Sequence, residues 1–163
     1  MNIKVGRALQ TMALMQLDKS GVLLLVKEEY NKLIKCIELK RIVLCSLNCQ
    51  LNSDIFKQLG PGQAKVDFKP SFNLKSKDEK TICAEANFNV NVFEDDKNEK
   101  LFKIESSFLL IYEVKEECED RAIEEFIKRN VPLNAWPYGR EIISNLTSKM
   151  GLPPLNIGLY KVF

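Results

Sequence analysis

Four segments of the chain alternate apolar and polar residues, which is the pattern of strands with one buried face and one wet face. The third segment is the most regular, because its even-numbered positions are apolar from Ile82 to Val92, whereas its odd-numbered positions include Glu85 and three asparagines. The four segments are residues 39–51, 66–74, 81–93 and 102–114. We therefore expect four strands in succession along the chain.

The second and fourth segments carry further signals. Pro70 interrupts the second segment, so this strand is expected to lie at a sheet edge or to contain a bulge. In the fourth segment, Leu109 and Ile111 make the second half apolar on both faces. We expect that half to be covered by a helix or by another subunit.

Helical periodicity replaces the alternation on both sides of the strands. Residues 1–37 fit two amphipathic helices with a break at Asp18–Gly21, and residues 119–129 fit a third helix. These segments predict helices before and after the sheet, with no helix between consecutive strands.

A last helix has start and stop signals of its own. Asn134 is suited to cap it, and Pro137 is suited to a first turn that needs no N–H donor. Gly151 and the pair Pro153–Pro154 end it, which predicts a helix of about 13 residues. The aromatic run 136–138 is then expected on the loop before this helix.

Consecutive strands followed by helices are typical of an α+β fold, in which helices pack on one face of an antiparallel sheet. The chain has 163 residues, of which 45% are hydrophobic, and it can therefore bury one core of ordinary domain size. We divide it into an N-terminal helical extension, residues 1–37, and a single domain, residues 38–163.

The charge pattern predicts neither a nucleic acid nor a membrane as partner. The 24 basic and 22 acidic residues are mixed along the chain, and the net charge is +2. The longest aliphatic run, Val22–Val26, is far shorter than the roughly 20 residues of a membrane-spanning helix. The N-terminus lacks the apolar region of a secretory signal, so we expect a cytoplasmic protein.

The residues that most enzymes use are scarce in this chain. Histidine is absent, which removes the commonest general base and the commonest zinc ligand. The five cysteines form no CxxC pair and are expected to be buried, reduced thiols. The glycines form no phosphate-binding loop, and the acidic loop 94–100 lacks the spacing of an EF-hand calcium site. We expect no metal, no cofactor and no enzymatic activity, while a small enzyme that uses a cysteine or a carboxylate stays open as the alternative.

Two motifs near the C-terminus resemble a known family. The run Trp136-Pro137-Tyr138-Gly139-Arg140-Glu141 and the run Leu152-Pro153-Pro154-Leu155-Asn156 are similar to the end of the SecB chaperone family, and the order of strands and helices from Leu39 to Phe163 agrees with that family. The resemblance implies a four-stranded antiparallel sheet backed by helices, and a homotetramer built as a dimer of dimers. It also implies an ATP-independent holdase that binds unfolded polypeptides in hydrophobic grooves through many weak apolar contacts.

The resemblance also gives roles to particular residues. A groove for the client chain is assigned to Phe88, Phe102, Phe108, Tyr112, Trp136, Pro137 and Tyr138. Judged from the residues alone, the last three could equally seal the core between sheet and helix. An oligomer interface, where helices meet at the centre of the tetramer, is assigned to Arg140, Glu141, Ile142, Ile143 and Leu146.

Two departures from the family pattern bear on the choice of partner. Members devoted to export continue beyond the second run into another helix and an acidic tail, and they tend to carry acids where this chain has Ser46 and Gln50. These departures argue against docking to the SecA motor. Solitary SecB-like chaperones that accompany toxin-antitoxin pairs show comparable divergence. Guarding an antitoxin is therefore the favoured role. General preprotein export is the alternative, and an adaptor for one folded partner is a third hypothesis.

Overall fold

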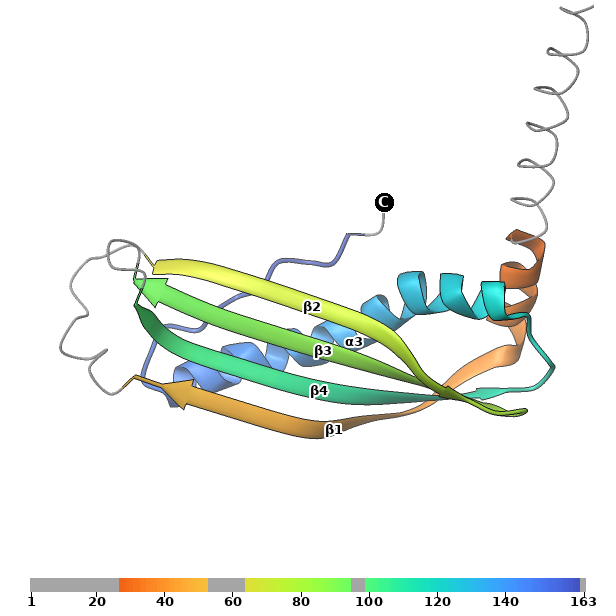
Figure 1. Ribbon diagram of the computed structural model, residues 1–163, viewed down its shortest axis with the longest axis horizontal. Coiled ribbons are helices and arrows are strands. Elements are labelled where there is room, and N and C mark those ends of the chain that lie inside the picture. The colour runs from red at the N-terminus through yellow and green to blue at the C-terminus, as the bar shows by residue number, and fades with distance from the viewer. Residues whose placement is uncertain (1–26, 53–63, 95–98, 162–163) are drawn as a thin grey trace, which may run out of the picture.

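A computed structural model of the chain describes residues 27–52, 64–94 and 99–161. Within these ranges, a twisted antiparallel sheet lies against one long helix (Figure 1). The elements are β1 (Ile37–Leu51), β2 (Ala64–Lys77), β3 (Thr81–Glu94), β4 (Lys100–Val114) and α3 (Asp120–Lys149). The spatial order is β1-β4-β3-β2, so that β1 and β2 form the two edges of the sheet. The expected α+β fold, with four antiparallel strands and a helix on one face, is confirmed.

The inner strand β3 and the edge strand β2 follow the predicted alternation. In β3, every even-numbered residue from Ile82 to Val92 is buried beneath α3, and the odd-numbered residues between them are half-exposed. Pro70 lies in β2, which is an edge strand of the sheet, as predicted. The buried row of β3 forms the centre of the hydrophobic core.

In β1, two irregularities change which residues face the helix. The simple alternation put Arg41 and Val43 on the same face as Leu47, but the register with β4 shifts between Leu39 and Arg41 and again between Leu44 and Ser46. Each shift turns the following residues to the opposite face. As a result, Ile42 and Leu44 lie on the helix side of the sheet, opposite buried residues of β4, whereas Val43 lies on the far side.

The C-terminal half of the chain differs most from expectation. α3 is one continuous helix of 30 residues, with Pro132 and Pro137 inside it, where the sequence predicted two helices separated by a loop. Asn134 is therefore not a cap, and its Nδ2 instead donates a hydrogen bond to the hydroxyl of Tyr112, 3.0 Å away. Proline inside a helix costs about 3 kcal/mol. Burial of one face of α3 against the sheet, including Val131 and Ala135, offsets that cost.

Two glycines fix the position and the end of α3. A Cβ atom at Gly139 would come within 2.6 Å of the Phe88 ring, so a glycine is needed where the helix passes closest to β3. Gly151 has a φ of 76°, in the left-handed region, and Leu152 N–H returns to the Thr147 carbonyl at 3.1 Å. The helix thus ends at the predicted glycine, in a backbone conformation that residues other than glycine rarely adopt.

Residues 27–36 form a helix that leads into β1 and belongs to the same core as the sheet. Leu33 and Cys36 are buried in that core, and the hydroxyl of Tyr30 donates a hydrogen bond of 2.6 Å to Asn130 Oδ1 on α3. The predicted break at residues 18–21, the helix before it and most of the acidic loop 94–100 lie outside the described residues. The division at residue 37 therefore stays a prediction.

None of the helices in the described ranges combines the length and the apolar character needed to cross a membrane.

Candidate functional site

An aromatic cluster lies between α3 and the sheet, with Phe88 at its centre. The Phe88 ring stacks on Phe68 at 6.4 Å between centroids, and it meets Phe72, Phe108 and Trp136 edge to face at 5.9 to 6.0 Å. Such offset and edge-to-face pairs are the favoured arrangements of aromatic rings. The cluster links the β2 edge of the sheet to α3 through rings in van der Waals contact.

The strand residues that were assigned to the client groove lie beneath its surface. Phe88, Phe102, Phe108 and Tyr112 are at most 7% exposed, so in the single chain they form the floor of the sheet-helix layer. The Tyr112 ring contacts Phe126 edge to face at 4.9 Å. Burial raises the pKa of Tyr112 to about 12, although the hydrogen bond from Asn134 acts in the opposite direction.

An apolar groove opens between β2 and α3 above this floor. Phe68, Phe72 and Leu74 pair with buried residues of β3 and therefore point to the helix side of the edge strand. A shallow cavity of about 210 Å³ lies between Phe72 and Leu74 on β2 and Ile127 on α3. Leu74 is 45% exposed. We call the surface formed by Phe68, Phe72, Leu74, Ile127 and Trp136 the β2–α3 groove.

The chain itself covers part of this groove. After α3, residues 152–161, which we call the tail, run back over the sheet-helix layer toward β2 (Figure 1). Trp136 Nε1 donates a hydrogen bond of 2.7 Å to the carbonyl of Gly158. The ring of Tyr160 lies 5.0 Å from Trp136 and 6.2 Å from Phe72 between centroids. The end of the groove near Trp136 is therefore occupied, while the end near Leu74 is open.

The three residues expected on a loop are in the middle of α3, and they point to different places. Trp136 faces β2 through its contact with Phe68, whereas Tyr138 contacts Phe108 of β4, at 6.2 Å. Pro137 is exposed and lines a cavity of about 310 Å³ beside the tail. The structure thus separates Trp136 from Tyr138, which the sequence had grouped in one groove.

Tyr138 belongs to a second apolar surface, on the other side of α3. Leu44 of β1 lies opposite Phe108 in the sheet, on the face that the helix covers, and Leu47 follows on the same face. Leu44, Leu47 and Tyr138 are 43%, 42% and 47% exposed, respectively. α3 packs mainly on β2, β3 and β4, so it leaves most of β1 uncovered. We call these three residues the β1 strip.

The residues assigned to an oligomer interface have mixed positions on α3. Ile143 is fully buried in the core of its own chain, Ile142 and Leu146 are half-buried, and Glu141 is exposed. Glu141 accepts a hydrogen bond of 3.1 Å from Asn145 Nδ2 rather than pairing with Arg140. Ile143 therefore acts as a core residue, and the other positions remain at or near the surface.

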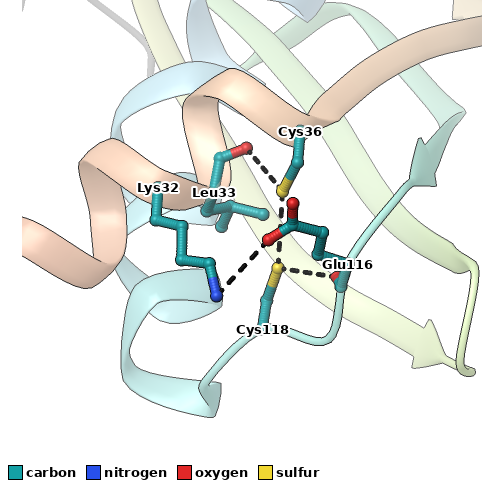
Figure 2. A network of polar contacts seen from close by, with 5 residues as sticks. All are labelled: Lys32, Leu33, Cys36, Glu116 and Cys118. Atoms are coloured by element: carbon teal, nitrogen blue, oxygen red, sulfur yellow. Dashed lines mark hydrogen bonds and ion pairs between the residues drawn. The ribbon is translucent and has the colours of Figure 1, made fainter.

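Cys36 and Cys118 form a close pair of thiols (Figure 2). Cys45 and Cys49 are exposed on β1, contrary to the expectation that all five thiols are buried. Cys36 Sγ lies 3.8 Å from Cys118 Sγ, and Cys118 donates to the carbonyl of Glu116, whose carboxylate pairs with Lys32 at 3.3 Å. Burial, together with the nearby Cys36 thiol, raises the pKa of Cys118 to about 11. The Cys118 thiol therefore stays protonated near neutral pH, which makes it a poor nucleophile.

A cavity of about 430 Å³ adjoins Cys118. It is lined by both acidic and basic side chains, with Ile82, Val114 and Ile123. Its mixed lining suits solvated charges better than an apolar peptide. In the described part of the chain, no group of three or more acidic or cysteine side chains is placed to hold a metal ion.

Sequence reasoning missed the members of the β2–α3 groove that come from β2. Phe68, Phe72 and Leu74 had been recognised as one face of a strand, but the groove was assigned to strands nearer the centre of the sheet. Pro70, which marked this strand as an edge, was the available signal. An edge strand has a neighbour on one side only, so its apolar row can remain accessible at the border of the sheet. No local signal linked Tyr160 to Trp136.

Comparison with known proteins agrees with this fold. Residues 40–159 match the family model described as preprotein translocase subunit SecB. The solved Mycobacterium tuberculosis Rv1957 SecB-like chaperone, in complex with a ChAD peptide from the Rv1956 HigA1 antitoxin, is similar with a TM-score of 0.67 at 13% identity, over 83% of this chain and 98% of that one. A protein of unknown function from Streptococcus agalactiae gives a TM-score of 0.47 at 12% identity, over 76% and 97% of the two chains.

No individual curated protein matches the chain in sequence. The family model nevertheless spans the sheet, α3 and most of the tail, which is well over half of the chain. The family resemblance drawn from the two C-terminal motifs is thus confirmed, and the chain belongs to the SecB family.

Proposed function

We propose that this protein is an ATP-independent holdase, which binds unfolded polypeptides along the β2–α3 groove. The observation that carries the proposal is an apolar groove at the edge of the sheet, open near Leu74 and closed near Trp136 only by an extended segment of the chain. Burial of apolar client surface contributes roughly 25 cal/mol per Å² before ordering costs. Many contacts of this kind hold an unfolded chain without reading its sequence.

The groove assigned here includes part of the set expected from the sequence. Trp136 lines it directly, Phe88 and Phe108 support its rings from below, and Phe102 and Tyr112 belong to the core farther along β4. Pro137 borders the tail. Tyr138 is on the opposite side of α3, and we assign it to contacts between subunits.

We further propose a homotetramer in the cytoplasm. The β1 strip supports self-association, because its exposed aliphatic residues lie on an edge strand. Within the described ranges, the outer edge of β1 has no neighbouring strand. Arg140, Glu141, Ile142 and Leu146 lie on the last turns of α3, where a second contact between dimers is available. Binding clients before they fold fits a location where new chains are made.

An antitoxin is the favoured client class. The similar Mycobacterium chaperone was solved with an antitoxin-derived peptide, which supports this role for a chain of the same fold. Ser46 and Gln50 are neutral and exposed on β1, which argues against the SecA docking expected of general export. A toxin-antitoxin gene pair beside the gene for this chain would favour the antitoxin role, and its absence would favour export.

The thiol chemistry gives the enzyme alternative little support. Burial raises the pKa values of both Cys118 and Cys49, which opposes formation of a reactive thiolate at neutral pH. Alkylation of the thiols tests this directly. Client binding by the alkylated protein is expected to persist, and a turnover that alkylation abolishes would support the enzyme instead.

A binding assay with one protein in two states tests the holdase. The unfolded probe is reduced, carboxymethylated pancreatic trypsin inhibitor, a tryptophan-free chain that cannot refold, and the folded probe is the same protein with its disulfides intact. We expect binding of the unfolded form alone. Leu74→Lys places a charge in the open end of the groove and should weaken that binding roughly tenfold, equivalent to about 1.4 kcal/mol.

Val43→Lys is the matched control. Val43 is 41% exposed, close to the value for Leu74, but it lies on β1 and on the far face of the sheet. Its substitution should change client affinity by less than about twofold, since rim contacts away from a binding surface contribute little. Equal losses of client affinity in Leu74→Lys and Val43→Lys would reject the groove assignment. Binding of the folded probe alone would support an adaptor for one folded partner.

A further inference from the structure

The end of the tail lies in the β2–α3 groove as an extended peptide would. Residues 153–161 form neither helix nor strand, so their main-chain groups are not used in a sheet or a helix. Trp136 Nε1 donates to the Gly158 carbonyl at 2.7 Å, and two residues later the Tyr160 ring contacts both Trp136 and Phe72. A main-chain carbonyl followed by an aromatic side chain is a feature that many unfolded segments can present.

The attachment of the tail differs between its two halves. Near α3, Leu155 N–H donates to Thr147 Oγ1 at 2.9 Å, and Leu155 and Ile157 pack against the core. Beyond Ile157, the hydrogen bond to the rest of the described chain is the one from Trp136, and Leu159 is 76% exposed. Residues 158–161 can therefore leave the groove while the first half keeps its contacts with α3.

We propose that residues 158–161 compete with the client for Trp136 and Phe72, so that a client must displace them to use the closed end of the groove. The proposal rests on the holdase function and adds a form of regulation to the same site. The Trp136 indole N–H can donate to any main-chain carbonyl, so it does not distinguish the tail from a client. The apparent association constant for the client is then the intrinsic constant multiplied by the fraction of molecules whose groove is open.

Substitution of the competing ring tests the proposal. Tyr160→Ala removes the aromatic contact with Trp136 and Phe72 but leaves the groove residues intact. We expect it to bind reduced, carboxymethylated pancreatic trypsin inhibitor about fivefold more tightly than the native sequence, because fewer molecules are closed. Leu159→Ala is the matched control in the same segment, and its affinity should not change.

Intrinsic fluorescence gives an independent readout, because Trp136 is the single tryptophan of the chain. Tyr160→Ala should shift its emission to longer wavelength in the absence of client, as the indole becomes more exposed to water. Circular dichroism and a thermal melt confirm that the variant remains folded. The tryptophan-free client allows the same emission to be followed during binding.

The outcomes separate the two proposals. Tighter binding by Tyr160→Ala with the spectral shift, and no change in Leu159→Ala, supports competition. Weaker binding by Tyr160→Ala shows that the tail is a wall of the groove and overturns competition, while the holdase function stands. Unchanged affinity also overturns competition. Failure of every variant to bind the unfolded probe would reject the holdase function and, with it, the competition that depends on it.

Discussion

The two sides of α3 present similar apolar surfaces, but the described part of the chain covers only one of them. On the β2 side, the aromatic groove is closed at one end by Tyr160 of the tail. On the β1 side, Leu44, Leu47 and Tyr138 are each more than 40% exposed. A surface that the chain closes with a weakly held segment can be opened by a competitor, whereas a surface with no such cover needs another molecule. We therefore assign the β2 side to clients and the β1 side to self-association.

A substitution at Gly139, where α3 comes closest to Phe88, should have the largest effect on the packing between α3 and the sheet. Gly139→Val forces its side chain into the Phe88 ring, which lies 2.6 Å from the position of a Cβ atom, and it displaces the ring that supports the β2–α3 groove. We expect a loss of about 3 kcal/mol in unfolding free energy, measured by urea denaturation. Gly158→Ala is the control, because a Cβ atom there meets nothing within 4 Å, and it should leave stability unchanged.

Charges on the β1 strip should affect assembly and spare client binding. Combining Leu44→Lys with Leu47→Lys places two charges on a surface that we assign to a subunit contact, and self-association should weaken about a hundredfold. Analytical ultracentrifugation measures the change. Leu74→Lys, on the other side of α3, should leave the assembly intact. Loss of assembly in Leu74→Lys alone would exchange the roles of the two sides.

Tyr112 lies in the core between the two surfaces, and its ionisation should have a smaller effect, on stability at alkaline pH. An unfolded tyrosine ionises near pH 10, whereas burial raises the pKa of Tyr112 to about 12 in the folded chain. Between these values the unfolded state loses a proton that the folded state keeps, so stability should fall as the pH rises from 10 to 12. Tyr112→Phe should flatten this part of the stability curve, measured by denaturant titration at each pH.

The same substitution also removes the hydrogen bond from Asn134, at a cost of about 1 kcal/mol at neutral pH. Neither effect should depend on the client or on the oligomer, because Tyr112 is buried beneath α3. An unchanged slope above pH 10 in Tyr112→Phe would show that other groups control the alkaline loss of stability.

The sequence predicted the strands well because their alternation is a local property. Residues 81–93 carry that signal most regularly, and β3 begins and ends within one residue of the prediction. The continuity of α3 was missed, because Asn134 and Pro137 have the local features of a new helix start, whereas packing against the sheet keeps one helix continuous through Pro132 and Pro137. The shifts in β1 were also missed, since a bulge changes the facing of Ile42 and Leu44 without any distinctive residue.

The groove depends on contacts between segments far apart in sequence, which explains why its residues were only partly found. Trp136 was identified from a family motif, but its partners Phe68 and Tyr160 come from an edge strand and from the tail. Local periodicity identifies a face of a strand and does not show which helix or tail crosses it. The side of α3 on which each aromatic residue lies required the structure.

Site-specific photocrosslinking compares the two sides of α3 in one measurement. A photoreactive amino acid replaces Leu74 in one variant and Leu47 in another, at positions of similar exposure. Each variant is illuminated with reduced, carboxymethylated pancreatic trypsin inhibitor. The account predicts a client adduct from position 74 and a covalent dimer of the chain from position 47. A client adduct from position 47, with none from position 74, would contradict the assignment of clients to the β2–α3 groove.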